Sequence, residues 1–384
     1  MDKIDELLTR GVANVIPNKE SLEKLLRSGK KLNIYFGVDP TAPHLHLGNA
    51  THLRRLQALS DLGHNITFLI GDFTALIGDT SDKDSERPVL TLEQIDTNWQ
   101  TYKSQAEKLV DFSKITIRRN SEWLSKLSFE NTIKLIHEFS LNDFISRELI
   151  KRRLGSENST INLAETLYPV MQGYDSWFLD TDLQLGGTDQ TFNMQAGRVL
   201  QKNRRNKESY ILTGEFLEGT DGRKMSKSWS NAIWLDDAPN EIYGKIMSLK
   251  DGLIERYFLL ATNLSSDQIP TSGHPMELKK QLAHQIVLEL HDAKSADAAK
   301  AHFESTFQKG LIPSTLPEFT VTSTNIVDVL VEAGLASSKS DAKRLIDQNA
   351  VEVDEKKIHD TLYVIHDTHV LKVGRRFAKV SKQI

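Results

Sequence analysis

Short apolar runs and longer amphipathic stretches alternate over the first two-thirds of the chain. The apolar runs predict five strands, at residues 32–38, 66–71, 115–118, 182–186 and 210–213. The amphipathic stretches predict helices, around residues 48–62, 92–111, 163–179 and 189–202. In the first of these helices Leu53, Leu56 and Leu59 fall on one side, as packing on a sheet requires. The alternation therefore predicts an α/β core built on a parallel sheet flanked by helices.

The pattern changes twice along the chain, which divides it into three predicted domains. The α/β core occupies residues 1–232 and includes a helical insertion at about 110–160. Residues 233–315 carry helical periodicity and predict a helical domain. A stretch rich in Pro, Ser and Thr, 311–325, breaks the helical period and indicates a linker. Residues 322–384 then form a small third domain.

The composition narrows the chemistry that is possible. The 384 residues include 39% hydrophobic and 26% charged residues, which is ordinary for a folded globular protein. The chain has no cysteine, which excludes disulfides, thiolate catalysis and cysteine-based zinc sites. The net charge of −4 gives no overall attraction to nucleic acid, so any RNA contact must come from a local patch.

The N-terminus shows no targeting signal. Residues 1–16 place acidic residues among the apolar ones and lack the uninterrupted apolar core of a secretion signal. No apolar run approaches the roughly 18 residues that would span a bilayer. We therefore expect a cytoplasmic protein.

Two distant segments together indicate chemistry on a nucleoside triphosphate. His46 precedes Leu47, Gly48 and Asn49, where a strand and loop turn into a helix whose free N–H groups can bind phosphate. A small residue such as Gly48 allows a nucleotide to approach the backbone. The later loop Lys224-Met-Ser-Lys-Ser supplies mobile donors for phosphates. Each segment alone is more often structural, with His46 as a helix cap and the lysines as solvated charges.

The combination resembles the class I aminoacyl-tRNA synthetases. Their signatures are His-x-Gly-His after the first strand and KMSKS in a later loop, and this class is built on a Rossmann-like sheet. The KMSKS sequence is intact here, whereas the fourth position of the first signature is Asn49. An asparagine still donates a hydrogen bond, so we expect function to be retained.

Further segments resemble the tyrosyl-tRNA synthetases within that class. The resemblance implies that Tyr35, in YFGVDPT, and Asp175, in YPVMQGYD, meet the phenol of the substrate. A phenol is one donor and one acceptor, and phenylalanine would leave both protein groups buried and unpaired. Discrimination of this kind reaches about 10⁵ in this family and needs no editing domain.

The resemblance also assigns the rest of the substrate site. Tyr168, Gln172 and Asp175 share one helix face at i, i+4 and i+7. The groups implied to hold the remainder of the tyrosine are Tyr168, Gln172, Asp79 and Gln190. The groups implied to bind ATP are Asp39, Gly48, Gly187, Asp189, Lys224, Met225, Ser226 and Lys227. The groups implied to assist adenylate formation are His46, Asn49, Thr41, Lys224, Lys227, Lys83 and Arg87. We expect no resident metal or organic cofactor, and ATP to act as a substrate with Mg²⁺.

The last sixty residues resemble an S4-type RNA-binding domain of the α+β class. Ser338 and Asp341 have capping-box spacing at the start of a predicted helix. Residues 338–384 carry a net charge of +3 against −7 for the rest of the chain. The residues expected to contact RNA are Lys339, Lys343, Arg344, Arg375 and Arg376.

The resemblance implies a ligase that joins tyrosine to the α-phosphate of ATP and then to the 3′ end of tRNA(Tyr). The resemblance implies a homodimer that uses the insertion around 110–160. Three alternatives remain: a tryptophanyl-tRNA synthetase, a non-catalytic RNA-binding relative, and another adenylate-forming nucleotidyltransferase. The first has no use for Tyr35 and Asp175 aimed at a phenol, the second would not keep a complete substrate set, and the third needs no RNA-binding tail.

Overall fold

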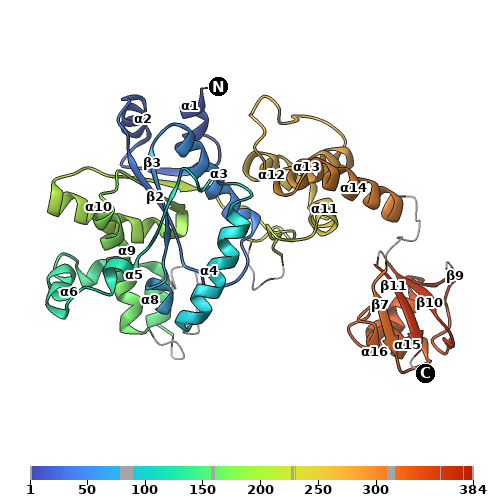
Figure 1. Ribbon diagram of the computed structural model, residues 1–384. Helices are drawn as coiled ribbons and strands as arrows, with labels where there is room; N and C mark the ends of the chain where they lie inside the picture. Colours follow the sequence, from blue (N-terminus) through green and yellow to red (C-terminus); the bar gives the residue numbers. More distant parts are fainter. Residues whose placement is uncertain are drawn as a thin grey trace. The chain divides into compact units, whose positions relative to one another are not determined.

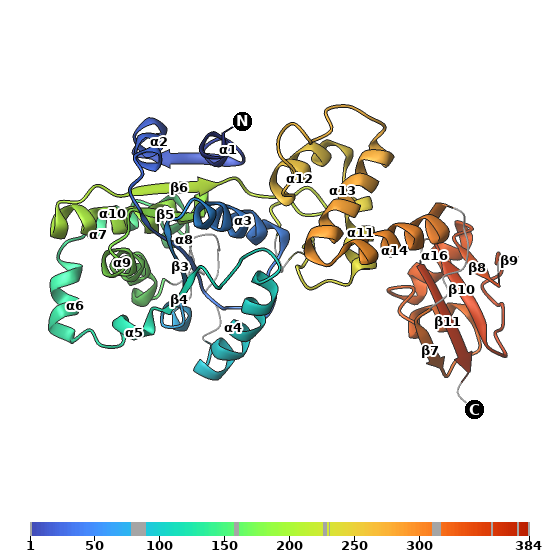
Figure 2. The ribbon, with the colours of Figure 1, turned by 45° about the horizontal axis from the view of Figure 1, so that its top comes forward.

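A computed structural model describes most of the chain. The described residues are 2–77, 90–156, 161–225, 229, 231–308, 316–354, 356–374 and 376–382. The chain separates into two compact units, Met1–Ala296 and Asp297–Ile384. Figures 1 and 2 show the elements of each unit. The predicted division of the chain at residue 232 and the other domain boundaries stay predictions.

A six-stranded sheet forms the centre of the first unit. Its strands run in the order β1 (Val12–Ile16), β6 (Tyr210–Gly214), β5 (Leu183–Gly187), β2 (Asn33–Val38), β3 (Asn65–Ile70) and β4 (Thr116–Arg119). All neighbours from β6 to β4 pair in parallel, whereas β1 pairs antiparallel with β6. The five predicted strands and the parallel core are confirmed, and β1 is an additional edge strand.

Helices cover both faces of this sheet. Figure 2 shows α3 (Leu47–Asp61) and α4 (Leu92–Ala106) on one face, and α9 (Leu163–Phe178) and α10 (Thr191–Arg205) on the other. The insertion contributes α5 (Ser121–Leu124), α6 (Phe129–Ile136), α7 (Leu141–Ile145) and α8 (Glu148–Leu154). Two further helices, α1 (Lys3–Leu7) and α2 (Lys19–Arg27), lie before the first parallel strand. Because the sheet is covered on both faces, its central strands β2, β3, β5 and β6 are largely buried and mostly apolar.

The helical region follows the sheet along the chain, and Arg10 connects it to the N-terminal segment through hydrogen bonds. Its helices are α11 (Pro239–Met247), α12 (Ile254–Ala261), α13 (Pro275–Leu290) and α14 (Ala293–Phe303). The guanidinium of Arg10 donates to the carbonyl oxygens of Leu259 (2.6 Å), Thr262 (2.8 Å) and Leu264 (2.5 Å). These carbonyls lie at and just beyond the C-terminal end of α12, where helix carbonyls have no partner inside the helix. Arg10 therefore caps α12 from the segment that leads into β1.

The second unit begins within α14, at Asp297, and its body is a small mixed sheet packed with two further helices. The strands run in the order β7 (Glu318–Val321), β11 (Arg376–Lys382), β10 (His369–Val373), β8 (Val351–Val353) and β9 (Lys356–Lys357). The helices are α15 (Ile326–Glu332) and α16 (Lys339–Asp347). Their apolar faces pack on the sheet in a core that includes Ile326, Leu330, Ile346, Val351, Leu371 and Val380. The expected α+β tail domain is confirmed.

No helix within the described ranges is long and apolar enough to cross a membrane.

Candidate active site

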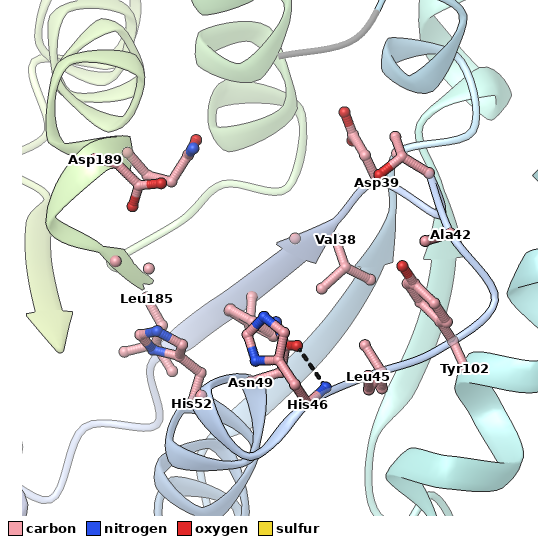
Figure 3. Close-up of a pocket in the computed structure, with 18 of the residues that line it drawn as sticks. Val38, Asp39, Ala42, Leu45, His46, Asn49, His52, Tyr102, Leu185 and Asp189 are labelled. Carbon is pink, nitrogen blue, oxygen red and sulfur yellow. Dashed lines mark hydrogen bonds between the residues drawn. The ribbon is translucent and has the colours of Figure 1, made fainter. Parts of the chain in front are cut away.

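A cavity of about 620 Å³ opens where β2 and β5 end and α3 begins. This is the carboxyl edge of a parallel sheet, where ligands bind in folds of this kind. Residues far apart in the sequence meet there, and Figure 3 shows part of the lining. The predicted site residues that line the cavity are Tyr35, Asp39, Thr41, His46, Gly48, Asn49, Tyr168, Gln172, Asp175, Gly187, Asp189, Gln190, Lys224 and Met225. The predicted residues Asp79, Lys83, Arg87, Ser226, Lys227 and Arg375 lie outside the described residues.

Asp175 is buried in the cavity wall and held by two side-chain donors. Its carboxylate accepts hydrogen bonds from Trp123 Nε1 (2.7 Å) and Asn120 Nδ2 (3.1 Å). Burial raises the pKa of Asp175 to about 8, although the two donors act in the opposite direction. Near neutral pH the carboxyl group of the protein alone therefore holds its proton to a large extent. It can then serve a phenol either as acceptor or as donor.

Tyr35 lies on β2 beside the same end of the cavity. Its hydroxyl donates to Gln184 Oε1 (3.1 Å), and Gln184 in turn donates to the Met194 carbonyl (2.9 Å). Burial, together with the nearby carboxylate of Asp175, raises the pKa of the Tyr35 hydroxyl. Gln184 is 0% exposed, so its amide fixes the direction of the Tyr35 hydroxyl. The Gln172 side chain also hydrogen-bonds to the Tyr35 hydroxyl and acts against this rise in pKa. A hydroxyl oxygen has two lone pairs, so it can accept one further hydrogen bond.

Asp39 and Tyr168 meet directly, which the sequence did not indicate. The Tyr168 hydroxyl donates to Asp39 Oδ2 (2.8 Å), and Thr74 Oγ1 donates to Asp39 Oδ1 (2.8 Å). The carboxylate lies so close to the backbone of Gly71 that a Cβ there would stand 1.9 Å from Asp39 Oδ1. Only glycine fits at this point. The sequence assigned Asp39 to ATP and Tyr168 to the substrate ammonium, and the structure places both groups in one cluster.

His46 is the N-cap of α3, and the side chain of Asn49 completes the start of this helix. Asn49 Oδ1 accepts from the His46 backbone N–H (3.0 Å). The N–H groups of Leu47, Asn49 and Ala50 already have backbone partners, at Ile233 and His46. We expected the first N–H groups of this helix to be free for phosphate. Three of them are already bonded, so fewer donors remain for a phosphate than expected. Burial and the nearby Lys224 lower the pKa of His46 to about 4, so the imidazole is neutral at physiological pH.

Lys224 lies against the opposite wall of the cavity. Its Nζ is 3.5 Å from Asp189 Oδ2 and 4.2 Å from the centre of the Phe216 ring. Asn231 anchors the segment, because its amide donates to the Lys224 carbonyl (3.2 Å) and to Asp221 Oδ1 (2.8 Å). Met225 is buried, and its N–H donates to the Leu217 carbonyl (3.1 Å). The first lysine of the KMSKS segment is thus held at the pair Gly187 and Asp189, which the sequence assigned to the ribose.

Several residues of this site were missed by the sequence analysis. Asn120 and Trp123 lie in the insertion and reach Asp175 only through the fold, so no local signal points to them. Gln184 is a polar residue in the middle of an apolar strand, and that position could have indicated a buried partner. Asn231 follows the KMSKS segment closely, but its role depends on a loop conformation that the pattern does not contain.

The predicted RNA-binding residues of the second unit have different surroundings. Lys339 pairs with Asp328 (2.8 Å), and Arg344 pairs with Asp341 (2.5 Å) on the exposed side of α16. Lys343 lies between them and is exposed. The guanidinium of Arg376, in contrast, donates to the carbonyls of Gly334 and Leu335 beyond the end of α15. Arg376 therefore has a structural task in addition to any contact with RNA.

Comparison with known proteins agrees with this geometry. A family model described as tRNA synthetases class I (W and Y) matches residues 27–308, and a tyrosine–tRNA ligase SYY-like C-terminal domain matches residues 306–378. The tyrosine–tRNA ligase of Thermotoga maritima is 40% identical over 98% of this chain and 96% of its own length. Tyrosine–tRNA ligase 2 of Vibrio cholerae is 42% identical over 97% of each chain.

Solved structures share the fold. A C-terminally truncated mitochondrial tyrosyl-tRNA synthetase from Coccidioides posadasii superposes with a TM-score of 0.64 at 24% identity, over 78% of this chain and 91% of that one. The tyrosyl-tRNA synthetase of Archaeoglobus fulgidus, solved with L-tyrosine, gives a TM-score of 0.60 at 23% identity, over 77% and 99% of the two chains.

The family match on a parallel-sheet fold defines the class of protein, a class I aminoacyl-tRNA synthetase. That class model covers enzymes for both tryptophan and tyrosine, and the full-length relatives decide between them. The chain belongs to the tyrosine–tRNA ligases.

Proposed function

We propose that the cavity is the site of tyrosine activation. Membership of the family gives tyrosine–tRNA ligase activity, with tyrosine, ATP and tRNA(Tyr) as substrates. In the first step a carboxylate oxygen of tyrosine attacks the α-phosphorus of ATP, the bond to the β-phosphate breaks, and pyrophosphate leaves. In the second step a 3′-terminal ribose hydroxyl of the tRNA attacks the tyrosyl carbonyl, and AMP leaves. No side chain needs to form a covalent bond with the substrate.

The pairing of Asp175 and Tyr35 at one end of the cavity carries this assignment to tyrosine. Both are 2% exposed, and each is fixed by buried partners that hold its polar atoms toward one place. A substrate phenol satisfies a carboxyl oxygen and the Tyr35 oxygen together. An aromatic ring without the hydroxyl leaves the remaining hydrogen-bonding capacity of both groups desolvated and unused, which costs up to about 1–3 kcal/mol for each.

The ammonium and carboxylate of tyrosine belong at the middle of the cavity. Gln172 Oε1 is buried and has no hydrogen-bond partner in the described part of the chain. It lines the cavity one helical turn after Tyr168, whose hydroxyl is already at Asp39. A cation placed there would gain the charge of Asp39 and the Gln172 oxygen as acceptors. Gln190 lines the same cavity and is the proposed neighbour of the substrate carboxylate.

His46 and Lys224 face the phosphates in this proposal. A neutral imidazole donates a hydrogen bond to the α-phosphate, and the value of that bond rises as negative charge builds in the transition state. Thr41 and Asn49 line the same part of the cavity. Lys224 moves from Asp189 to the leaving pyrophosphate, which its flexible side chain allows. The Gly187 and Asp189 positions then bind the ribose.

Mg²⁺ is proposed to enter on the phosphates of ATP. Over the residues that the structure describes, no group of three or more His, Asp or Glu side chains could hold a metal ion. Mg²⁺ typically binds substrate phosphates with only one or two protein carboxylates. Its contribution would be to offset the phosphate charge, and equilibrium dialysis with and without ATP would test this dependence.

The insertion is proposed to form the interface of a homodimer. Apolar side chains that are exposed on and around its helices include Phe129 (82%), Ile133 (43%), Leu141 (63%), Leu154 (59%) and Leu163 (73%). Such a group of exposed apolar residues favours burial against another protein surface. Sedimentation of the purified protein as a monomer at micromolar concentration would contradict this proposal.

Because its substrates are tRNA and ATP, we also propose that the protein is cytoplasmic. Cell fractionation would test this location.

The experiment that tests the proposed function is ATP–pyrophosphate exchange with purified protein and each of tyrosine, phenylalanine and tryptophan. We expect exchange with tyrosine only. Exchange driven by tryptophan would contradict the amino-acid assignment and keep the class. The absence of exchange with all three, in a protein that still binds tRNA, would instead indicate a non-catalytic RNA-binding relative.

The exposed side of α16 gives a prediction for the tRNA step alone. Replacing Lys339 and Lys343 with Ala should lower kcat/KM for tRNA about tenfold and reduce its salt dependence, because two phosphate contacts are lost. Exchange with tyrosine should be unchanged, since that reaction does not involve tRNA. The matched control replaces Lys356 and Lys357, two exposed lysines on β9 of the same unit. An equal loss in both double variants would show that overall charge, rather than α16, binds the tRNA.

A further inference from the structure

Arg256 on α12 contacts the segment that leads from β6 to Lys224, but it has no part in the reaction described above. Its Nη2 donates to the Phe216 carbonyl oxygen (2.8 Å) and lies 3.3 Å from Glu215 Oε2. Its Nε forms an ion pair with Glu218 Oε2 at 2.8 Å. One guanidinium therefore holds a backbone carbonyl and two carboxylates of a segment that borders the cavity.

Backbone pairing fixes Lys224 to this segment. Lys224 and Glu218 form an antiparallel bridge, and the N–H of Met225 donates to the Leu217 carbonyl (3.1 Å). Residues that face each other in such a bridge have Cβ atoms about 4.5–5.5 Å apart, with both side chains on the same face. The Glu218 carboxylate can therefore reach the Lys224 ammonium whenever no other group holds it.

The two side chains have different partners in the structure. The Lys224 ammonium lies 3.5 Å from Asp189 Oδ2. Glu218 is held by Arg256 at its carboxylate, and its backbone carbonyl accepts from the hydroxyl of the buried Tyr257 (2.6 Å). This separation matters because, in the proposed function, Lys224 leaves Asp189 for the pyrophosphate. A second carboxylate within reach would compete with the pyrophosphate for the ammonium.

The helix α12 is held in place independently of this segment. Arg10 donates to the carbonyl oxygen of Thr262 (2.8 Å), just beyond the C-terminal end of the helix. Ile254 and Phe258 are buried on the side of the helix opposite Arg256. The position of the Arg256 guanidinium is therefore set by the helical region rather than by the segment that it holds.

We propose that Arg256 is a positioning residue for tyrosine activation, which holds the Glu218 carboxylate away from Lys224 and so keeps the ammonium available to the departing pyrophosphate. This inference rests on the proposed function, because it takes Lys224 as a group that acts on pyrophosphate. Arg256 lies outside the cavity lining in the described part of the chain, so its effect passes through the segment. Its loss should lower kcat and leave the binding of tyrosine unchanged.

The test compares Arg256→Met with the parent protein in tyrosine-dependent ATP–pyrophosphate exchange. Methionine keeps part of the apolar stem and removes the charge. We expect kcat to fall about tenfold and KM for tyrosine to stay within about twofold, because the phenol end of the cavity is formed by other elements. Arg198→Met is the matched control. Arg198 also binds a carbonyl oxygen, that of Ser209 (2.8 Å), and pairs with Glu208, but it lies on α10 outside the described cavity lining.

A second substitution separates positioning from a general loss of structure. Glu218→Gln removes the competing charge, so the double variant Arg256→Met/Glu218→Gln should recover kcat to within about threefold of the parent. In a Lys224→Ala background, Arg256→Met should cause no further loss, because the group that it protects is already absent. Arg256→Lys keeps a cation beside Glu218 and should keep kcat, and it replaces the methionine variant in the test if that variant fails to fold.

The outcomes distinguish this proposal from its alternatives. An unchanged kcat in Arg256→Met would overturn it. A loss that Glu218→Gln does not relieve, or an equal further loss in the Lys224→Ala background, would show that Arg256 only stabilises the fold. If the methionine variant does not fold, a tenfold loss in Arg256→Lys overturns the proposal in its place. The absence of exchange in the parent would instead contradict the proposed function itself.

Discussion

Replacing Asp175 with Asn should lower kcat/KM for tyrosine by about 10²-fold or more and leave kcat/KM for phenylalanine nearly unchanged. The amide keeps the size of the carboxyl group. Its NH₂, however, must face one of the two donors that now bind Asp175, at Trp123 Nε1 or Asn120 Nδ2. The phenol hydroxyl also loses a carboxyl oxygen as its partner. Phenylalanine never uses that partner, so the discrimination between the two amino acids should collapse.

Pyrophosphate exchange at saturating ATP measures this change directly. Asp180→Asn is the matched control, because Asp180 follows the same helix but is 52% exposed and pairs with Lys207 (2.9 Å) at the surface. Asparagine also tolerates its left-handed backbone, at φ 48°. If Asp175→Asn keeps the tyrosine-to-phenylalanine ratio of the parent, Asp175 does not recognise the phenol.

Replacing His46 with Ala should lower kcat for adenylate formation by about 10²–10³-fold, while KM for ATP changes by only a few fold. This is the magnitude for one positioned donor whose hydrogen bond strengthens in the transition state. The backbone of residue 46 would still accept the first bonds of α3, so the helix should keep its start. Rapid quenching of a single turnover separates this step from product release.

His44→Ala is the control for His46. It lies two residues earlier on the same loop, is half exposed, and pairs with Asp236 at 2.7 Å. We expect its kcat within about threefold of the parent, because a surface contact of this kind contributes little. Because the pKa of His46 is lowered to about 4, the rate of the parent should not change between pH 6 and 9 through this group. An equal loss of kcat in both variants would indicate that the loop, rather than the His46 imidazole, matters.

Most of the sheet could be predicted from the sequence, because strands buried on both faces are short apolar runs between helical patterns. The strand β1 could not. Its residues Val12–Ile16 pair with Ile211–Gly214, about two hundred positions away, and two of its five residues are exposed. A short strand with a mixed pattern carries little local information, and only its distant partner makes it a strand.

The candidate site divides in a similar way. Tyr35, His46, Gln172 and Asp175 could be named because their segments resemble those of a known family. The residues that support them could not be named from the sequence. Gln184 contacts Tyr35 from a neighbouring strand, and Trp123 contacts Asp175 from a helix of the insertion, so both contacts depend on the tertiary fold. The link between Tyr168 and Asp39 was hidden for the same reason, since it joins positions 129 residues apart.

The antiparallel edge strand β1 also affects the tendency of the protein to aggregate at high concentration. A parallel sheet that ended at β6 would present Ile211 and Leu212, now 0% exposed, along an unpaired row of backbone groups. β1 pairs with these backbone groups. The register of β1 is irregular between Val12 and Asn14, and such an irregularity bends the strand. At the other end, β4 is only four residues long and carries Arg118 and Arg119. The sheet thus offers no long flat edge onto which another chain could add a strand, which guards the protein against aggregation.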